Sequence, residues 1–170
     1  MRIGLLGGSF NPPHKGHLHI SDLALKKLNL DQIWWLPTKQ NPFKEKNTNY
    51  SQRYSKCVFL TKNHPKIYVK KYNDIYTERL IYRLKNKYKN TKFTWIMGAD
   101  NFEYFHKFKN FSRLVKSVSF AAFPRDDHFK KIRKTKAFLQ IKSNKKAKLE
   151  IFNTQKINIS STQIRNNQNV

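Results

Sequence analysis

Residues 3–18 read IGLLGGSFNPPHKGHL, and this stretch decides the fold that the rest of the chain must follow. A short apolar run from Ile3 to Leu6 is closed by Gly7 and Gly8, which is the pattern of a buried strand that enters a tight turn. Apolar residues then recur at helical spacing over residues 16–28. Because backbone N–H groups at a glycine turn and at the start of a helix favour anions, this segment is a candidate phosphate-binding site.

The alternation of strands and helices continues along the chain. Further strands are expected over residues 33–36, 66–70, 93–97, 118–123 and 149–152, and further helices over residues 51–63, 76–89 and 128–148. Residues 37–50 are rich in Pro, Asn and Lys without periodicity, which predicts a long exposed loop. The pattern therefore predicts an α/β, Rossmann-like doubly wound, mostly parallel sheet with helices on both faces. Ligands of such sheets bind outside the carboxyl ends of the strands.

Length and composition indicate one folded, strongly basic domain. The chain has 170 residues with no linker or internal repeat, so we expect a single domain over residues 1–170. Hydrophobic residues make up 38% of the chain, which excludes a disordered basic tail. The net charge of +25 attracts polyanions such as nucleotides or RNA. The lysines are spread along the chain, as a genome-wide composition bias would also produce, so no dedicated nucleic-acid partner is expected.

Cysteine usage and the apolar segments bear on the cellular compartment. Cys57 is the only cysteine, so the chain cannot form an internal disulfide. A single cysteine is consistent with a reducing compartment. The apolar run at the N-terminus is too short for a signal peptide, and no stretch of about 18 apolar residues could span a membrane. We therefore expect a cytoplasmic protein without a membrane partner. The sequence does not indicate an oligomeric state.

His14 and His17 are the first candidate functional side chains. A spacing of three places both imidazoles on one side of the first helical turn, where they can donate to a phosphate. A shared zinc ion would require further ligands, and no other Cys or His lies at an obvious ligand spacing. The segment as a whole favours phosphate over two ordinary surface histidines.

The second candidate segment, residues 159–165, reads ISSTQIR. Ser160 or Ser161 can cap a short helix, and Thr162 adds a hydroxyl. One turn later, the planar guanidinium of Arg165 is suited to bidentate phosphate binding. Taken alone, the segment is better explained as a helix cap followed by a solvated arginine, but together with the N-terminal segment it favours phosphate binding.

These two segments resemble known signatures. Residues 8–17 resemble the GxFDPxHxGH signature of the nucleotidylyltransferase superfamily, and residues 159–165 resemble its ISSTxIR signature. Within that superfamily, the chain looks most like bacterial nicotinate-nucleotide adenylyltransferase. Residues 97–100 are similar to its GAD turn, residues 37–44 to its substrate loop, and the resemblance runs in order from residue 3 to residue 165.

The resemblance implies adenylyl transfer from ATP to nicotinate mononucleotide, with Mg²⁺ bound by the phosphates of ATP and without a metal site built by the protein. It implies that the catalytic groups are His14, His17 and Arg165. It implies that ATP is held by Gly8, Ser9, Phe10, Gly16, Gly98, Asp100, Ser161 and Thr162, and that the mononucleotide is held by Lys44, Tyr76, Thr77 and Phe108.

The chain departs from the family at several positions. Asn41 and Phe43 stand where the substrate loop usually has Pro and His. Asn11 stands where most bacterial members have Asp, and Phe108 stands where the family has a Trp that stacks on the pyridine ring. Core packing is an equally good interpretation of Phe108. Asp100 could also cap a helix over residues 101–108, which is compatible with a contact to the ribose. Thr77 could cap the helix over residues 76–89, which leaves a role for the backbone there open.

Two other functions remain open at this point. A related adenylyltransferase acting on phosphopantetheine or on nicotinamide mononucleotide would share the two signatures. A basic RNA-binding protein on the same fold would use the positive charge and exposed aromatic side chains, and its RNA binding would depend steeply on salt.

Overall fold

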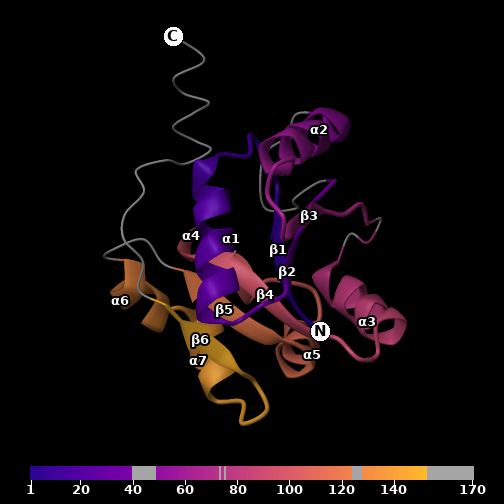
Figure 1. Ribbon diagram of the computed structural model, residues 1–170. Helices are drawn as coiled ribbons and strands as arrows, with labels where there is room; N and C mark the ends of the chain where they lie inside the picture. The colour runs from indigo at the N-terminus through magenta and orange to yellow at the C-terminus, as the bar shows by residue number, and fades with distance from the viewer. Residues whose placement is uncertain (40–48, 73, 75, 124–127, 153–170) are drawn as a thin grey trace.

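The computed structural model describes residues 1–39, 49–72, 74, 76–123 and 128–152 (Figure 1). Its sheet consists of β1 (Arg2–Gly8), β2 (Gln32–Pro37), β3 (Ile67–Val69), β4 (Lys92–Gly98), β5 (Ser119–Phe123) and β6 (Leu149–Ile151). The strand order is β3-β2-β1-β4-β5-β6, and every neighbouring pair is parallel. This arrangement confirms the predicted α/β, Rossmann-like fold class.

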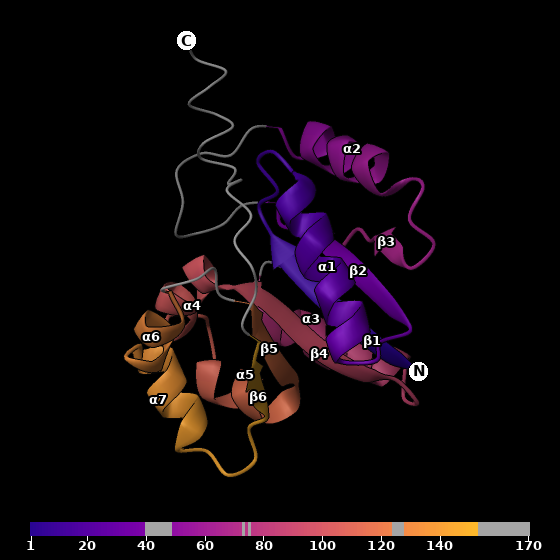
Figure 2. The same cartoon turned by 60° about the vertical axis from the view of Figure 1, so that its left-hand side comes forward.

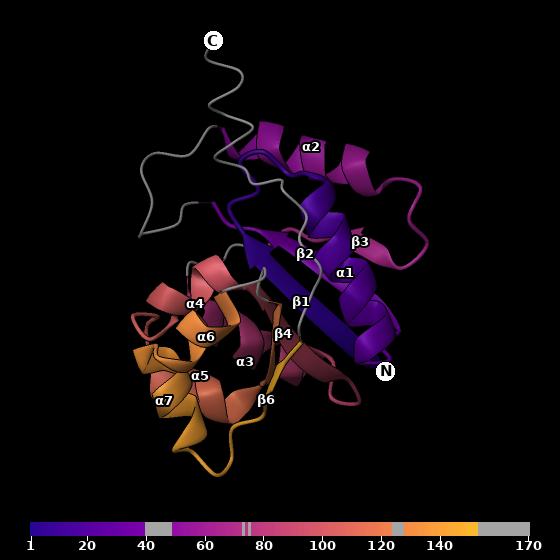
Figure 3. The same ribbon diagram turned by 90° about the vertical axis from the view of Figure 1, so that its left-hand side faces the viewer.

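Helices cover both faces of the sheet. They are α1 (Lys15–Lys27), α2 (Tyr50–Thr61), α3 (Thr77–Lys87), α4 (Ala99–Phe105), α5 (Phe111–Ser117), α6 (His128–Arg133) and α7 (Lys136–Lys142). Figure 2 shows α1 lying along β1 and β2, and Figure 3 shows α1 and α2 on one side of the sheet with the remaining helices on the other.

Alternation along the central strands builds a hydrophobic core on each face. In β2, Trp34 joins the core under α3, α4 and α5, whereas its neighbour Trp35 joins the core under α1 and α2. Successive side chains of a strand point to opposite faces, so a run that is apolar throughout buries both faces. Trp34, Trp35 and Trp95 are all buried, as the apolar strands predicted.

Several helix boundaries differ from the sequence-based expectation. The predicted helix over residues 128–148 is two helices, because Thr135 starts α7 by accepting a hydrogen bond from the N–H of Phe138 at 3.2 Å. Helix α5 was not predicted, since seven residues are too few to display a clear period. It is stabilised by burial of Phe111, Leu114 and Val115 against the core.

The two alternative capping roles are wrong. Helix α4 has Gly98 at its N-cap, so Asp100 lies inside the first turn, and the helix ends at Phe105 rather than at residue 108. Helix α3 has Tyr76 at its N-cap without a side-chain cap bond, so Thr77 is its first helical residue. Among the residues that the structure describes, no helix is long and apolar enough to cross a membrane.

Candidate active site at the carboxyl edge of the sheet

The topology places the loop after β1 next to the turn after β4. From β1 the chain moves to β2 and β3 on one side, whereas from β4 it moves to β5 and β6 on the other. The direction therefore reverses between β1 and β4, which are hydrogen-bonded neighbours. The loop after Gly8 and the turn at Gly98 both leave the sheet at this point. Ligands of open α/β sheets bind at such a switch point.

His14 and His17 cap helix α1 reciprocally. The Nδ1 atom of His14 accepts a hydrogen bond from the N–H of Gly16 at 3.1 Å, and the Nδ1 atom of His17 accepts one from the N–H of His14 at 3.2 Å. The ring centroids are 4.0 Å apart, which confirms that both imidazoles lie together on the first turn. Each Nδ1 atom is an acceptor, so in this geometry the proton of each neutral imidazole is on Nε2. The cap thus makes Nε2–H the donor of both side chains.

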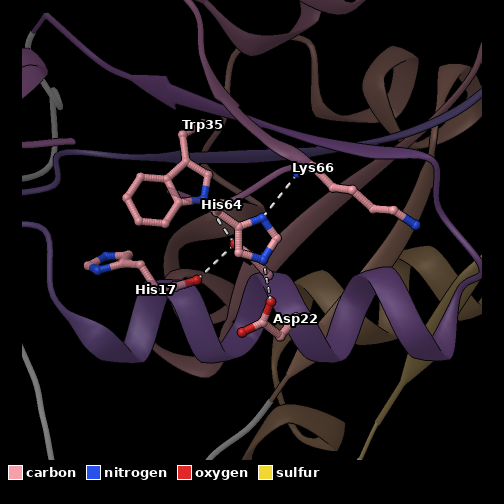
Figure 4. Close-up of polar contacts among 6 residues, drawn as sticks. His17, Asp22, Trp35, His64 and Lys66 are labelled. Carbon is pink, nitrogen blue, oxygen red and sulfur yellow. Dashed lines mark hydrogen bonds and ion pairs between the residues drawn. The ribbon is translucent and has the colours of Figure 1, made fainter. Parts of the chain in front are cut away.

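Side chains that are buried in the core contact both the backbone and the ring of His17. The Oγ atom of Ser21 donates to the carbonyl oxygen of His17 at 2.8 Å and accepts from the Nε1–H of Trp35 at 2.9 Å (Figure 4). The ring of Phe10 stacks on Trp35 at 4.9 Å and lies 4.8 Å from the ring of His17. These contacts restrain the position of the imidazole.

Phe10 is the residue of the loop with an unusual backbone. Its φ of 47° is in the left-handed region, which is rare for a bulky side chain. Burial of its ring, which is 1% exposed, offsets that strain. Gly7, by contrast, is still in β1, and a Cβ there would lie 2.5 Å from the ring of Trp95.

The loop after β1 is also tied to the segment after β2. The carbonyl oxygen of Gly8 accepts from the N–H of Thr38 at 2.9 Å and from its hydroxyl at 3.2 Å. The carbonyl oxygen of Ser9 accepts from Nη1 of Arg53 on α2. Gly16 is buried in the first turn of α1. The loop between β1 and α1, with the residues at its two ends, therefore contains four residues predicted to contact ATP: Gly8, Ser9, Phe10 and Gly16.

Arg53 was missed by the sequence analysis. Its side chain is 1% exposed, and Nη2 donates to the carbonyl oxygen of Lys39 at 3.0 Å. Burial lowers the pKa of its guanidinium from the ordinary value. A signal was present in the sequence, because Arg53 is four residues before buried Cys57 and eight before buried Thr61, a helical spacing that puts a charge on the inward face of α2.

A second group of predicted residues surrounds the start of α3. Phe108 is half-buried and packs edge-on against Phe105, with ring centroids 4.9 Å apart. The next residue, Lys109, places its ammonium 4.3 Å from the centroid of the Tyr76 ring. Lys109 was also missed, since a lysine in so basic a chain carries no distinguishing signal. The side chain of Lys109 thus connects the segment after α4 to the start of α3.

The two described acidic side chains near the start of α3 are each in an ion pair, Asp74 with Arg83 and Glu78 with Arg113. Glu78 is buried in the first turn of α3 and lies 3.5 Å from Nη1 of Arg113 and 3.5 Å from the side-chain amide of Asn110. Positive charge from Lys109 and Arg79, whose guanidinium lies 6.0 Å from the Tyr76 ring centroid, adds to the positive end of the helix dipole. The start of α3 therefore suits an anionic group.

The remaining predicted residues lie outside what the structure can describe. Lys44, Ser161, Thr162 and Arg165 are outside the described residues, as is the side chain of Asp100. Within the described ranges, no group of three or more His, Cys, Asp or Glu side chains could hold a metal ion.

Comparisons with known proteins agree on one family. The cytidylyltransferase-like family profile matches residues 5–167. A protein of Ruegeria sp. (strain TM1040) named "Probable nicotinate-nucleotide adenylyltransferase" is 42% identical over 122 residues, which are 69% of this chain and 65% of that protein. Proteins of the same name from Agrobacterium fabrum and Rhizobium meliloti are 37% and 35% identical over 74% of this chain, covering 70% and 69% of their lengths. The matched segment thus spans about two thirds of these relatives.

Solved structures share the fold. The Plasmodium falciparum nicotinic acid mononucleotide adenylyltransferase complexed with NaAD superposes with a TM-score of 0.79 at 21% identity, covering 97% of this chain and 82% of that chain. A putative nicotinate-nucleotide adenylyltransferase from Vibrio parahaemolyticus gives a TM-score of 0.59 at 21% identity, covering 72% and 73%. With the profile match and the relatives at 35–42% identity, the chain belongs to the cytidylyltransferase-like family and, within it, to the nicotinate-nucleotide adenylyltransferases.

Proposed function

We propose that this protein transfers the adenylyl group of ATP to nicotinate mononucleotide, which yields nicotinate adenine dinucleotide and pyrophosphate. The observation that carries the proposal is the reciprocal cap of His14 and His17 at the switch point between β1 and β4. It gathers two imidazoles at a helix start, where phosphate groups bind. Family membership supports the same reaction.

The reaction is an in-line displacement. An oxygen of the mononucleotide phosphate forms a bond to the α-phosphorus of ATP while the bond from that phosphorus to the α,β-bridging oxygen breaks, and pyrophosphate leaves with the electron pair. A phosphate is already an adequate nucleophile at neutral pH. Positioning and charge stabilisation therefore supply most of the rate, and neither a protein nucleophile nor a strong base is required.

His17 would donate to the α-phosphoryl oxygens as negative charge develops, and His14 would donate to the adjoining phosphates. Ser161, Thr162 and Arg165 would hold the β- and γ-phosphates, with Gly98 and Asp100 at the ribose. Lys44 would meet the phosphate of the mononucleotide.

Mg²⁺ fits this site as an ion carried by ATP. The described donors of the β1–α1 loop are N–H groups and imidazoles rather than carboxylates. Mg²⁺ commonly keeps several waters and is held largely by substrate phosphates. When bound, it would neutralise phosphate charge.

The start of α3 supports selection of the acid over the amide. Tyr76, Thr77 and Phe108 would enclose the pyridine ring, and the positive charge near Tyr76 would favour a carboxylate substituent. We further propose that the chain acts as one domain in the cytoplasm, which the single continuous sheet and the lone buried cysteine support.

The test is pyrophosphate release from MgATP with nicotinate mononucleotide, nicotinamide mononucleotide or phosphopantetheine offered separately. We expect kcat/KM to be higher for the nicotinate substrate by about tenfold or more, since about 1.4 kcal/mol of differential binding suffices. Equal values for acid and amide would contradict the selectivity. Turnover with phosphopantetheine alone, or RNA binding with steep salt dependence and no turnover, would replace the proposed function.

A further inference from the structure

Arg53 is a charged side chain in a position where charge is costly. It lies on α2 with its guanidinium almost entirely removed from solvent, and α2 is not among the elements that the family signatures mark. A buried cation is retained only where hydrogen bonds compensate for lost hydration. The carbonyl oxygens of Ser9 and Lys39 provide such bonds, one for each terminal nitrogen.

The two carbonyls belong to different loops. Ser9 follows β1 and precedes the paired histidines, whereas Lys39 follows β2 and begins the segment expected to meet the mononucleotide. They lie 30 residues apart, and α2 comes later in the chain than either. One planar group with two arms can join two loops in a fixed geometry, which a single ammonium group reproduces poorly.

The bond to Ser9 also sets the direction of a neighbouring donor. In a trans peptide the C=O and N–H groups point in opposite directions. The described cis bond is at Asn11–Pro12, so the Ser9–Phe10 peptide is trans. Because the Ser9 carbonyl points towards α2, the N–H of Phe10 points away from it. By the same reasoning, the Gly8 carbonyl that accepts from Thr38 of the β2 side directs the N–H of Ser9 away from β2.

We infer that Arg53 is a positioning residue for nucleotide binding: through Ser9 it orients the backbone donors of the β1–α1 loop, and through Phe10 it sets the ring of His17. The inference rests on the proposed function for the identity of the nucleotide. The connection from Ser9 to His17 is short, since Phe10 is the next residue and its ring lies 4.8 Å from the imidazole.

The experiment compares variants of one helix face in the full chain. Arg53→Met removes all donors and keeps the length of the stem, and Arg53→Lys keeps the charge without the two-armed geometry. Thr61→Val is the matched control, because Thr61 is also buried on α2 but donates to the carbonyl oxygen of Cys57 in its own helix at 3.0 Å. The readouts are the dissociation constant of MgATP, kcat, KM for each substrate, and Tm.

We expect both Arg53 variants to weaken MgATP binding and lower kcat/KM by about tenfold to 10²-fold, because a misplacement of about 1 Å can cost about 10²-fold. The loss should be smaller for Arg53→Lys, and Thr61→Val should retain wild-type constants even if its Tm falls. Where Arg53→Met does not fold, Arg53→Lys carries the comparison.

Unchanged MgATP binding and kinetics in a folded Arg53 variant would overturn the inference. An equal loss in Thr61→Val would also overturn it, because the defect would then come from disturbing α2. Failure of the proposed function is distinguishable, since a wild-type chain that binds MgATP but transfers no adenylyl group leaves the binding comparison intact.

Discussion

At the scale of single residues, two imidazoles perform the capping that Ser or Thr and Glu perform at many other helix starts. The geometry occupies the Nδ1 atoms of His14 and His17 with backbone N–H groups. The remaining nitrogen of each ring is then a donor without any requirement for positive charge. Structural and chemical roles therefore use different atoms of the same side chain.

Replacement of His17 by Ala should lower kcat by about 10²-fold or more, the scale on which one donor to a developing charge acts. Pyrophosphate release from the folded variant measures it. His64→Ala is the control: that imidazole bonds Asp22 at 2.8 Å and the N–H of Lys66 at 3.2 Å, outside the candidate site (Figure 4). Wild-type turnover in folded His17→Ala would remove His17 from the mechanism.

Cys57 should make the free energy of unfolding decrease at alkaline pH. Burial raises the pKa of its thiol to about 12. The thiol of the unfolded chain loses its proton at about pH 8.5, well below the pH at which the thiol of the folded chain does. Above about pH 8.5, deprotonation therefore favours the unfolded chain. The contribution of the Cys57 thiol to the free energy of unfolding should therefore be complete below about pH 8.5 and decrease as the pH rises towards 12. Urea unfolding at several pH values measures the slope.

Cys57→Ser, which cannot titrate in this range, should show a shallower decline. Part of the slope should persist because burial also raises the pKa of Tyr72 to about 12. A stability that rises between pH 9 and 11, or identical slopes in both proteins, would contradict this account.

At the scale of elements, the ends of β1 and β4 show two different uses of glycine. Gly7 permits the Trp95 ring to approach the backbone of the neighbouring strand, since a Cβ would stand 2.5 Å from that ring. At Gly98, which caps the start of α4, a Cβ would meet no atom within 4 Å. One glycine is required by packing and the other is not.

Gly7→Ala should reduce the free energy of unfolding by about 1–3 kcal/mol, the usual cost of overpacking a core. Gly98→Ala is the matched variant and should change stability by well under that amount. Urea unfolding of both proteins compares them. Equal stability of the two variants would mean that the Trp95 ring moves aside at little cost.

At the scale of the whole molecule, the net charge of +25 opposes compaction. Described ion pairs, such as Arg83 with Asp74 and Arg113 with Glu78, engage a small part of the cationic surface. Several cations instead lie over aromatic rings, including Lys70 over Trp34 and Lys71 over Tyr54. Dissolved ions screen the mutual repulsion among the remaining cations.

Tm should therefore rise as NaCl is increased from about 0.01 M to 0.15 M and then level off, because the Debye length falls from about 30 Å to about 8 Å over this range. Thermal unfolding followed by circular dichroism measures it. A steady linear rise to high salt would indicate a general solute effect rather than screening, and a falling Tm would show that attractive ion pairs dominate.

Local patterns determined much of this protein. The apolar run before Gly7, the helical period after Gly16 and the spacing of His14 and His17 depend only on neighbours within a few residues. The structure confirms the strand, the helix and the pairing of the imidazoles. The parallel sheet followed from alternation, since strands joined by helices return in the same direction.

Tertiary structure alone decided which distant groups meet. Burial of Arg53 beneath Ser9 and Lys39, the approach of Lys109 to Tyr76, and the left-handed backbone of Phe10 each depend on packing between segments far apart in the chain. The identity of one side chain does not indicate its distant partner when the chain contains many side chains of the same type, as it does for lysine. Periodicity depends on residues close together in the chain, so it can be recognised in the sequence itself. Which long-range contact forms depends on the free energy of the whole packed core.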